Sequence, residues 1–121
     1  MLDRRNVRTA LKEIMNMSYR DGFGLRNCSW PGYDFYQPVP ADIWVDQGNT
    51  CWSGVELSFA SFLMYEGLVD EALKVTKTVD DRYRKCGRYW DHQEFGGHYF
   101  RPMGAWGILN GALGLAINQG V

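Results

Sequence analysis

Two helix-length segments that are apolar on nearly every side limit most strongly what this chain can fold into. Residues 55–65 carry a single charge, at Glu56, and residues 103–117 carry none. A helix of this kind must be surrounded by other elements, because no face of it favours water. The first of the two is expected to begin at about Thr50 or Ser53, and Ser53 is spaced from Glu56 as in a capping box. With 121 residues and 45% apolar content, the chain can bury such helices within one domain.

An amphipathic segment at residues 3–16 precedes the first apolar helix. Its apolar residues Val7, Leu11 and Ile14 recur at helical spacing, and Asp3 stands where its carboxylate can cap the first turn. One face of this helix is therefore expected to meet the core and the other to meet water.

A second amphipathic helix is expected over residues 69–86, between the two apolar ones. It opens with acidic side chains and closes with basic ones, an order that matches the helix macrodipole. Gly67 supplies the left-handed turn that separates it from the helix before it. Its predicted apolar stripe consists of Leu73, Thr76, Val79 and Tyr83.

The two longer connections, residues 17–49 and 87–101, hold most of the aromatic residues of the chain. Successive antiparallel helices alternate in direction, so both connections must emerge at the same end of the helices. Structureless connections as long as the first are uncommon unless they serve a site. We therefore interpret this end as the working face of an all-α fold, with buried helices in an inner ring and amphipathic helices in an outer ring.

The segment 90–106, WDHQEFGGHYFRPMGAW, has the composition of a binding loop. Its aromatic faces can lie against the C–H surface of a sugar ring, while Glu94 and Arg101 can form paired hydrogen bonds to neighbouring hydroxyls. Arg101 directly precedes a helix start at Pro102, where the macrodipole disfavours a cation that lacks a partner. A buried Glu–Arg pair that only holds the loop in place explains these two residues equally well.

Two alternative functions for this loop are a metal site and a catalytic pair of carboxylates. The spacing of His92, Glu94 and His98 fits no helical pair of zinc ligands, so we expect no metal or other cofactor and interpret His98 as a hydrogen-bonding residue of the pocket floor. Asp91 and Glu94 could be the two carboxylates of a glycosidase, although both on one short loop would be unusual. Trp52, at the start of an apolar helix and at the same end, is a candidate sugar platform or an ordinary core aromatic.

Composition argues against several classes of partner. Thirteen Lys and Arg residues against fourteen Asp and Glu residues form no basic stripe along a phosphate backbone, so nucleic acid is not expected. The widely separated Cys28, Cys51 and Cys86 are expected to be free thiols in a reducing, cytoplasmic compartment. The N-terminal residues lack the apolar run of a signal peptide, and no segment has the length and composition of a membrane span.

Two stretches of the chain resemble glycoside hydrolase family 116, the family of the non-lysosomal glucosylceramidase or bile-acid β-glucosidase. They are GNTCWSGVELSFASFLMYEGLVDEAL at 48–73 and WDHQEFGGHYFRPMGAWGILNGAL at 90–113. They are similar to the family's N-E-x-W-x-G-V-x-Y helix, its E-G-L-V-x-E turn and the E-x-G-x-H-Y-x-R segment of its microbial branch. The resemblance extends over residues 42–115.

The resemblance implies a retaining β-glucosidase on an (α/α)6 barrel, whose catalytic glutamate and aspartate lie upstream of the matching region. No catalytic residue is therefore assigned in this chain. The resemblance assigns substrate binding to four residues, Trp52, Glu94, His98 and Arg101. Thr50 stands where the family usually has a glutamate, and Gly97 replaces an acidic residue, which leaves the sugar preference open.

We therefore expect residues 1–121 to be a single partial domain of about four main helices, the C-terminal segment of an (α/α)6 catalytic barrel. Its expected partners are a β-glucoside-like carbohydrate substrate and the remainder of the barrel, because four helices cannot close such a ring. The chain alone is expected to be inactive and to associate through the uncovered faces of its apolar helices. The alternative is a non-catalytic helical module that binds carbohydrate or another partner.

Overall fold

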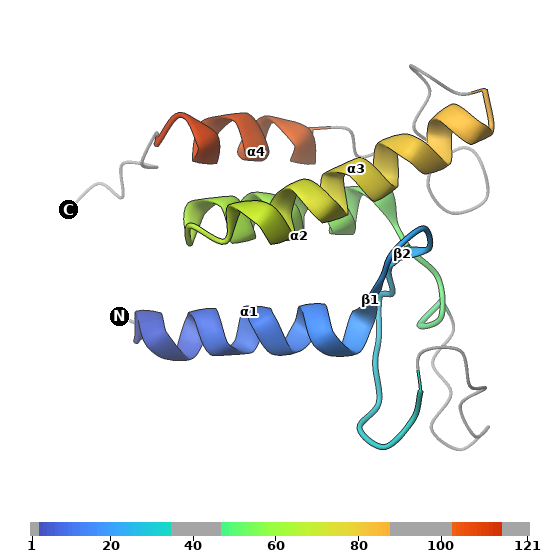
Figure 1. The fold of residues 1–121 in the computed structure, drawn as a ribbon, viewed down its shortest axis with the longest axis horizontal. Helices are drawn as coiled ribbons and strands as arrows, with labels where there is room; N and C mark the ends of the chain where they lie inside the picture. The colour runs from blue at the N-terminus through green and yellow to red at the C-terminus, as the bar shows by residue number, and fades with distance from the viewer. Residues whose placement is uncertain (1–2, 35–46, 88–102, 115–121) are drawn as a thin grey trace.

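The structure is a computed structural model that describes residues 3–34, 47–87 and 103–114. These residues form four helices and one small antiparallel sheet (Figure 1). In chain order the elements are α1 (Arg4–Ser18), β1 (Tyr19–Arg20), β2 (Gly24–Leu25), α2 (Ser53–Tyr65), α3 (Val69–Lys85) and α4 (Gly104–Ala112). The prediction of a mainly helical chain with four main helices is confirmed for this part, whereas the two-stranded sheet was not predicted.

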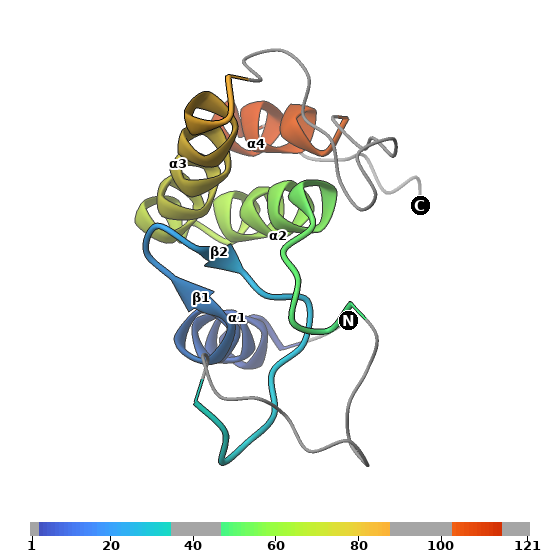
Figure 2. The same cartoon turned by 90° about the vertical axis from the view of Figure 1, so that its right-hand side faces the viewer.

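Helix α2 lies at the centre of the arrangement. Helices α1 and α4 lie on opposite sides of it, and α3 packs along a third side (Figure 2). Helix α1 ends, α2 begins, α3 ends and α4 begins at the same end of the molecule (Figure 1). We call this the loop-bearing end, and its position agrees with the direction predicted for the two long connections.

Three helix-end features were predicted. The Asp3 cap and the Gly67 turn are confirmed, and the capping box at Ser53 is wrong. The Asp3 carboxylate accepts a hydrogen bond from the backbone N–H of Arg5 at 2.8 Å, as expected of a cap. Gly67 has φ of +74° and ends the α2 segment. The capping box at Ser53 was wrong, because the cap position is Trp52, which makes no side-chain cap bond, and the Glu56 carboxylate turns inward instead.

The hydrophobic core forms where α2, α3, α1 and the β1–β2 hairpin meet. Its most deeply buried members, at 0% exposure, lie on α2 and α3. Helix α1 adds Leu11, and the hairpin adds Tyr19 and Leu25. The whole cluster consists of Leu11, Tyr19, Leu25, Ala60, Leu63, Met64, Leu68, Ala72 and Val75.

The face that α3 turns to the core agrees with the predicted stripe at Val79, which is 1% exposed, but differs from it by one residue in the first half of the helix. Leu73 is 53% exposed, whereas Ala72 and Val75 are 0% exposed. The small Ala72 lies in the cluster with Ala60, and short side chains allow two helices to approach more closely than a leucine would. Close packing against α2 therefore decides the orientation of α3.

Helix α4 contacts α2 through its glycines. A Cβ atom at Gly107 would lie 2.6 Å from the Ser61 hydroxyl oxygen, and one at Gly111 would lie 2.9 Å from Cγ of Met64. The Ser61 hydroxyl also donates a hydrogen bond to the carbonyl oxygen of Gly104 at 2.9 Å. The two backbones approach so closely that only glycine fits at the contact.

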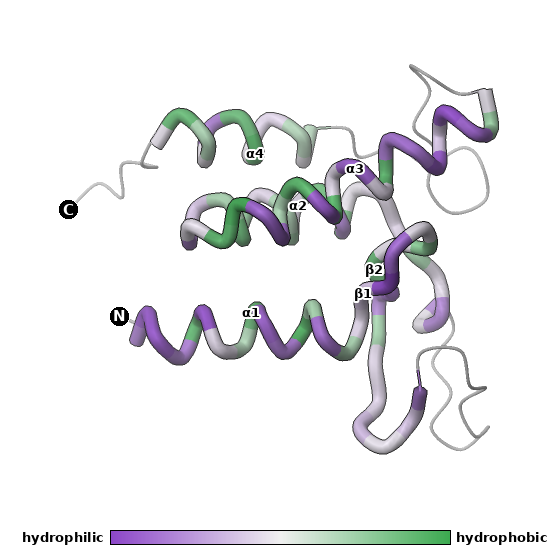
Figure 3. The backbone as a smooth tube through the Cα atoms, in the orientation of Figure 1, coloured by the Kyte–Doolittle hydropathy of each residue, from purple (hydrophilic) through white to green (hydrophobic). Residues whose placement is uncertain are grey.

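The opposite face of α4 is open among the described residues, although the helix is strongly apolar (Figure 3). Trp106 is 65% exposed and Leu113 is 63% exposed. The described part of residues 103–117 is therefore not surrounded within this chain, which agrees with the uncovered helix faces expected of a partial ring, and residues 115–117 lie outside the described part. A glycine contact covers only one narrow strip of a helix, so the large side chains beside it stay uncovered.

Candidate functional site

Of the predicted sugar-binding residues, Trp52 is the one that the described residues include. It is half-buried and occupies the cap position of α2, with an extended backbone at φ −103° and ψ 117°. It therefore lies at the loop-bearing end, where it was expected. Glu94, His98 and Arg101 lie outside the described residues, as do Asp91 and His92.

A buried ion pair lies one helical turn below Trp52. The side chain of Glu56 is 0% exposed and receives both terminal nitrogens of Arg82. The Arg82 Nη1 atom donates to Oε1 at 3.1 Å, and Nη2 donates to Oε2. This forked geometry joins α2 to the last turns of α3.

The same pair holds the β1–β2 hairpin. The backbone N–H of Leu25 donates to the Glu56 Oε1 atom at 2.8 Å, and Arg82 Nη1 donates to the carbonyl oxygen of Phe23 at 2.8 Å. Gly24 lies between these two contacts at φ of +126°, and a Cβ atom there would collide with both Arg82 and Glu56. A glycine is therefore required on steric and on conformational grounds.

The electrostatics of the ion pair fit a structural role. Burial alone would lower the pKa of Arg82, but the hydrogen bond and the charge of Glu56 raise it above its ordinary value. Arg82 therefore stays charged opposite the carboxylate. Because Glu56 has no exposed surface and accepts from three donors, it cannot reach a substrate and acts by positioning the backbone around it.

A hydrogen bond and a partly buried thiol lie at the entry to α2. The Tyr83 hydroxyl donates to the Ser53 hydroxyl oxygen at 3.2 Å, directly after Trp52. Cys51, directly before Trp52, is partly buried, and burial together with the charge of Glu56 raises the pKa of its thiol to about 12. Trp52 therefore lies between Ser53, which is hydrogen-bonded to Tyr83, and the protonated thiol of Cys51. The buried ion pair of Glu56 lies one helical turn further along α2.

Backbone hydrogen bonds join the two described ends of the α1–α2 connection. The N–H of Asn27 donates to the carbonyl oxygen of Thr50 at 2.9 Å, and that of Cys28 donates to Gly48 at 3.0 Å. The Thr50 hydroxyl donates to the carbonyl oxygen of Gln47 at 2.6 Å. Thr50 is thus exposed and stabilises a turn.

An apolar groove of about 680 Å³ runs beside this connection, between α1 and α2. Ile14 of α1, Phe59 of α2 and Trp30 line it. Arg26 is 4% exposed, and its guanidinium carbon lies 5.7 Å from the centroid of the Trp30 ring, a cation–π distance. Burial lowers the pKa of Arg26 from its ordinary value. The groove therefore combines an apolar wall with an arginine-backed tryptophan.

The ion pair of Glu56 and Arg82 was missed by the sequence reasoning, which assigned Glu56 to a cap and Arg82 to the helix dipole. One signal pointed to it, since Glu56 is the only charged residue within an otherwise apolar helix. A charge in such a helix needs a partner from another element. The partner itself was not predictable, because α3 offers several basic residues near its end.

In residues 3–34, 47–87 and 103–114, no group of three or more His, Cys, Asp or Glu side chains is arranged to hold a metal ion. The three cysteines are free thiols. None of the helices described combines the length and the apolar character needed to cross a membrane.

Comparison with known proteins adds no relative to these observations. No protein-family model matches the chain, and no match was found among curated proteins or solved structures.

Proposed function

We propose that this chain is a sector of an (α/α)6 glycoside hydrolase barrel that acts on a β-glucoside-like carbohydrate. In this proposal Trp52, Glu94, His98 and Arg101 contact the sugar, and the catalytic carboxylates belong to the remainder of the barrel. The proposal rests on the resemblance of residues 42–115 to family 116 and on the arrangement of the helices described above.

The observation that carries the proposal is the position of Trp52. It stands at the entry of α2, and this entry shares the loop-bearing end with the last turn of α3 and the first turn of α4 (Figure 1). The segment that contains Glu94 and Arg101 connects those two turns in the sequence. A sugar pocket at this end therefore needs no rearrangement of the helices to bring the two motifs into reach of each other.

The uncovered apolar surfaces on both sides of α2 support a barrel remainder as the partner. On one side is the groove between α1 and α2, lined by Ile14 and Phe59. On the other side is the outer face of α4, with Trp106 and Leu113. A sector cut from a ring of helical hairpins would have uncovered surfaces at both of its ends, and the described part of this chain has two such surfaces.

The direct test uses the full-length product of the gene and an aryl β-glucoside. Glu94→Gln and Arg101→Ala should each lower kcat/KM by about 10- to 100-fold, because each removes a charge-assisted hydrogen bond to the sugar. Glu71→Gln and Arg84→Ala are the matched controls on α3 and should leave kcat/KM unchanged. A full-length product that neither binds nor hydrolyses β-glucosides would overturn the proposal, as would turnover by the 121-residue chain alone.

A second candidate is a self-supporting helical module that binds carbohydrate without catalysis. The observation that favours it is the closed core between α2 and α3, where Ala60, Leu63 and Val75 are 0% exposed. Such a module would be monomeric, unfold cooperatively and bind a glucoside saturably, with binding lost in Trp52→Ala but not in Trp106→Ala. A barrel sector would instead self-associate, and Trp106→Lys would reduce that association in sedimentation velocity.

A further inference from the structure

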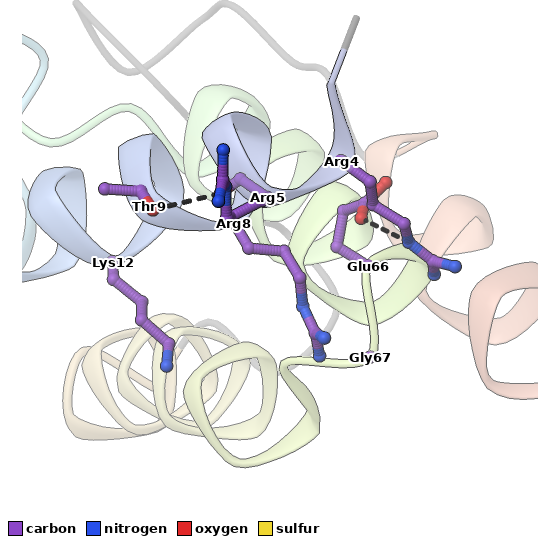
Figure 4. Close-up of a pocket in the computed structure, with 7 residues that line it drawn as sticks. All are labelled: Arg4, Arg5, Arg8, Thr9, Lys12, Glu66 and Gly67. Atoms are coloured by element: carbon purple, nitrogen blue, oxygen red, sulfur yellow. Dashed lines mark hydrogen bonds and ion pairs between the residues drawn. The ribbon is translucent and has the colours of Figure 1, made fainter.

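A second concave site lies near the N-terminal half of α1, away from the loop-bearing end. It is a pocket of about 640 Å³ between α1 and the turn that joins α2 to α3 (Figure 4). Its wall contains the cationic side chains Arg4, Arg5, Arg8 and Lys12 and the single carboxylate of Glu66. We call it the basic pocket.

The charges of the basic pocket are poorly compensated. Arg4 pairs with Glu66, with its Nε atom 3.0 Å from Oε2. Within the described residues, Arg5, Arg8 and Lys12 form no ion pair. The lining thus keeps an excess of positive charge after its one acidic residue is paired.

The first turn of α1 contributes to the wall of the basic pocket. The first turn of α1 holds Arg4 and Arg5 and no acidic residue. The N-terminus of a helix carries partial positive charge, which disfavours cations and favours anions. Asp3 caps the helix by accepting from the backbone N–H of Arg5. Because the Asp3 carboxylate already caps this helix end, the excess of positive charge in the basic pocket comes from the side chains of Arg5, Arg8 and Lys12.

Arg8 is placed to take part in binding. Its side chain leaves α1 toward Gly67, and its Nη2 atom lies 3.5 Å from where a Cβ atom of residue 67 would stand (Figure 4). Gly67 has φ of +74°, a conformation that other residues rarely adopt. The turn thus provides a small, fixed floor beneath the guanidinium.

We propose that the basic pocket binds the phosphoryl group of a phosphorylated ligand. Three of its four cations are arginines, whose forked N–H groups match the oxygens of a phosphate in pairs, which a lysine cannot do. The excess of positive charge matches an anion of more than one charge. The volume leaves room for the body of the ligand beside its phosphoryl group. This site is separate from the proposed sugar contacts, so it stands or fails independently of them.

The test is titration of inorganic pyrophosphate into the 121-residue chain, followed by calorimetry and backbone NMR shifts. We expect saturable binding with shifts centred on residues 4–12 and 66–67. The double variant Arg8→Gln and Lys12→Gln should weaken binding at least about tenfold. The control Lys74→Gln and Lys85→Gln removes the same charge from α3 and should leave the affinity within about twofold. An equal loss in both double variants would show non-specific attraction and overturn the proposal.

A conservative substitution separates fork geometry from charge. Arg8→Lys keeps the charge and removes the paired donors, so it should weaken pyrophosphate binding several-fold. Unchanged affinity in this variant would contradict a phosphoryl site. Circular dichroism should show that all variants keep the helical content of the parent, since Arg8 and Lys12 are exposed.

Two further binding measurements distinguish a lipid headgroup from a soluble phosphorylated molecule as the source of the phosphoryl group. Binding to vesicles of phosphatidylcholine with phosphatidic acid, but not to phosphatidylcholine alone, would assign the site to a lipid headgroup. Binding of pyrophosphate without vesicle binding would assign it to a soluble phosphorylated molecule. A preference for an oligoglutamate peptide over pyrophosphate, or no saturable binding of pyrophosphate, would overturn the proposal.

Discussion

Helix α2 meets its two partners in opposite ways. Against α3 it uses interlocking side chains and a buried ion pair, so that Leu63, Val75 and Glu56 lose all contact with water. Against α4 it offers Ser61 and Met64 to a row of glycines, and no residue of α4 in the described part is buried. The second contact places glycines directly against α2, yet it leaves Trp106 and Leu109 of α4 exposed.

The difference shows that close approach and burial are separate quantities. Glycines bring two helices together but bring no apolar surface of their own, whereas hydrophobic stabilisation follows the apolar area removed from water. The α2–α3 hairpin should therefore carry most of the stability. Helix α4 should be the first helix to detach and the first to accept another partner.

The largest effect is expected from breaking the buried ion pair. Glu56→Ala leaves the guanidinium of Arg82 and the N–H of Leu25 without their acceptor and should lower the free energy of unfolding by about 3 to 5 kcal/mol. Urea denaturation followed by circular dichroism measures it. The matched control is Glu66→Ala, which breaks the exposed pair with Arg4 and should cost less than about 1 kcal/mol. Equal losses would refute the structural role of Glu56.

The next effect compares the two interfaces with one kind of substitution. Leu63→Ala opens a cavity in the closed core and should cost about 2 to 5 kcal/mol. Leu109→Ala on the 49% exposed position of α4 should cost less than about 1 kcal/mol. The same urea titrations measure both variants, and a larger loss at Leu109 would show that the α4 contact dominates instead.

A methyl group added at the glycine contact should act on α4 alone. Gly107→Ala improves helix propensity by about 1 kcal/mol, but the new Cβ atom meets Ser61, and overpacking of this kind costs about 1 to 3 kcal/mol. We expect faster amide exchange in α4 and unchanged exchange in α3. At Gly104 the nearest atoms to an added Cβ are 3.3 Å away, so Gly104→Ala is the milder control. Slower exchange of α4 in Gly107→Ala would contradict the contact geometry.

The last effect is a pH dependence at the entry of α2, which is measurable only in alkaline solution. Because the pKa of Cys51 is raised to about 12, the folded chain holds this proton more tightly than the unfolded chain does. The corresponding stability is present below about pH 8.5, the pKa of a free thiol, and is lost as pH rises toward 12. Cys51→Ala should unfold with a shallower alkaline dependence than the parent, whereas Cys86→Ala at an exposed position should not. Identical alkaline curves would contradict a buried thiol at residue 51.

The extent of α1, α2 and α3 was predictable from local chemistry to within about two residues, whereas α4 ends at Ala112, before the predicted residue 117, and Gly114 after it has a left-handed backbone at φ +66°. Asp3 as a cap, the left-handed Gly67 and the charge order along α3 are signals that act within a few residues of the chain. The β1–β2 hairpin was not predictable in the same way. Its turn contains Asp21-Gly22, a pair that signals a hairpin, but strands of two residues each are too short to show the alternating pattern that would complete the signal.

The candidate site was predictable only in part. Trp52 was expected at the start of an apolar helix, and the structure has it there. Glu94, His98 and Arg101 stay predictions, because they lie outside the described residues. The buried ion pair below Trp52 depends on the meeting of Glu56, Arg82 and the hairpin, which are separated by tens of residues in the chain, and no local pattern selects one basic residue of α3 over its neighbours.

The amino-acid sequence by itself determined where the helices run and that two of them are too apolar to stand in water. Only the tertiary structure decided which faces meet: Ala72 rather than Leu73 toward α2, glycines rather than large side chains between α2 and α4, and an acid at position 56 turned inward to Arg82. The physical reason is that helix formation depends on neighbours along the chain. The choice of contacting faces depends on steric fit and charge pairing between segments that only folding brings together.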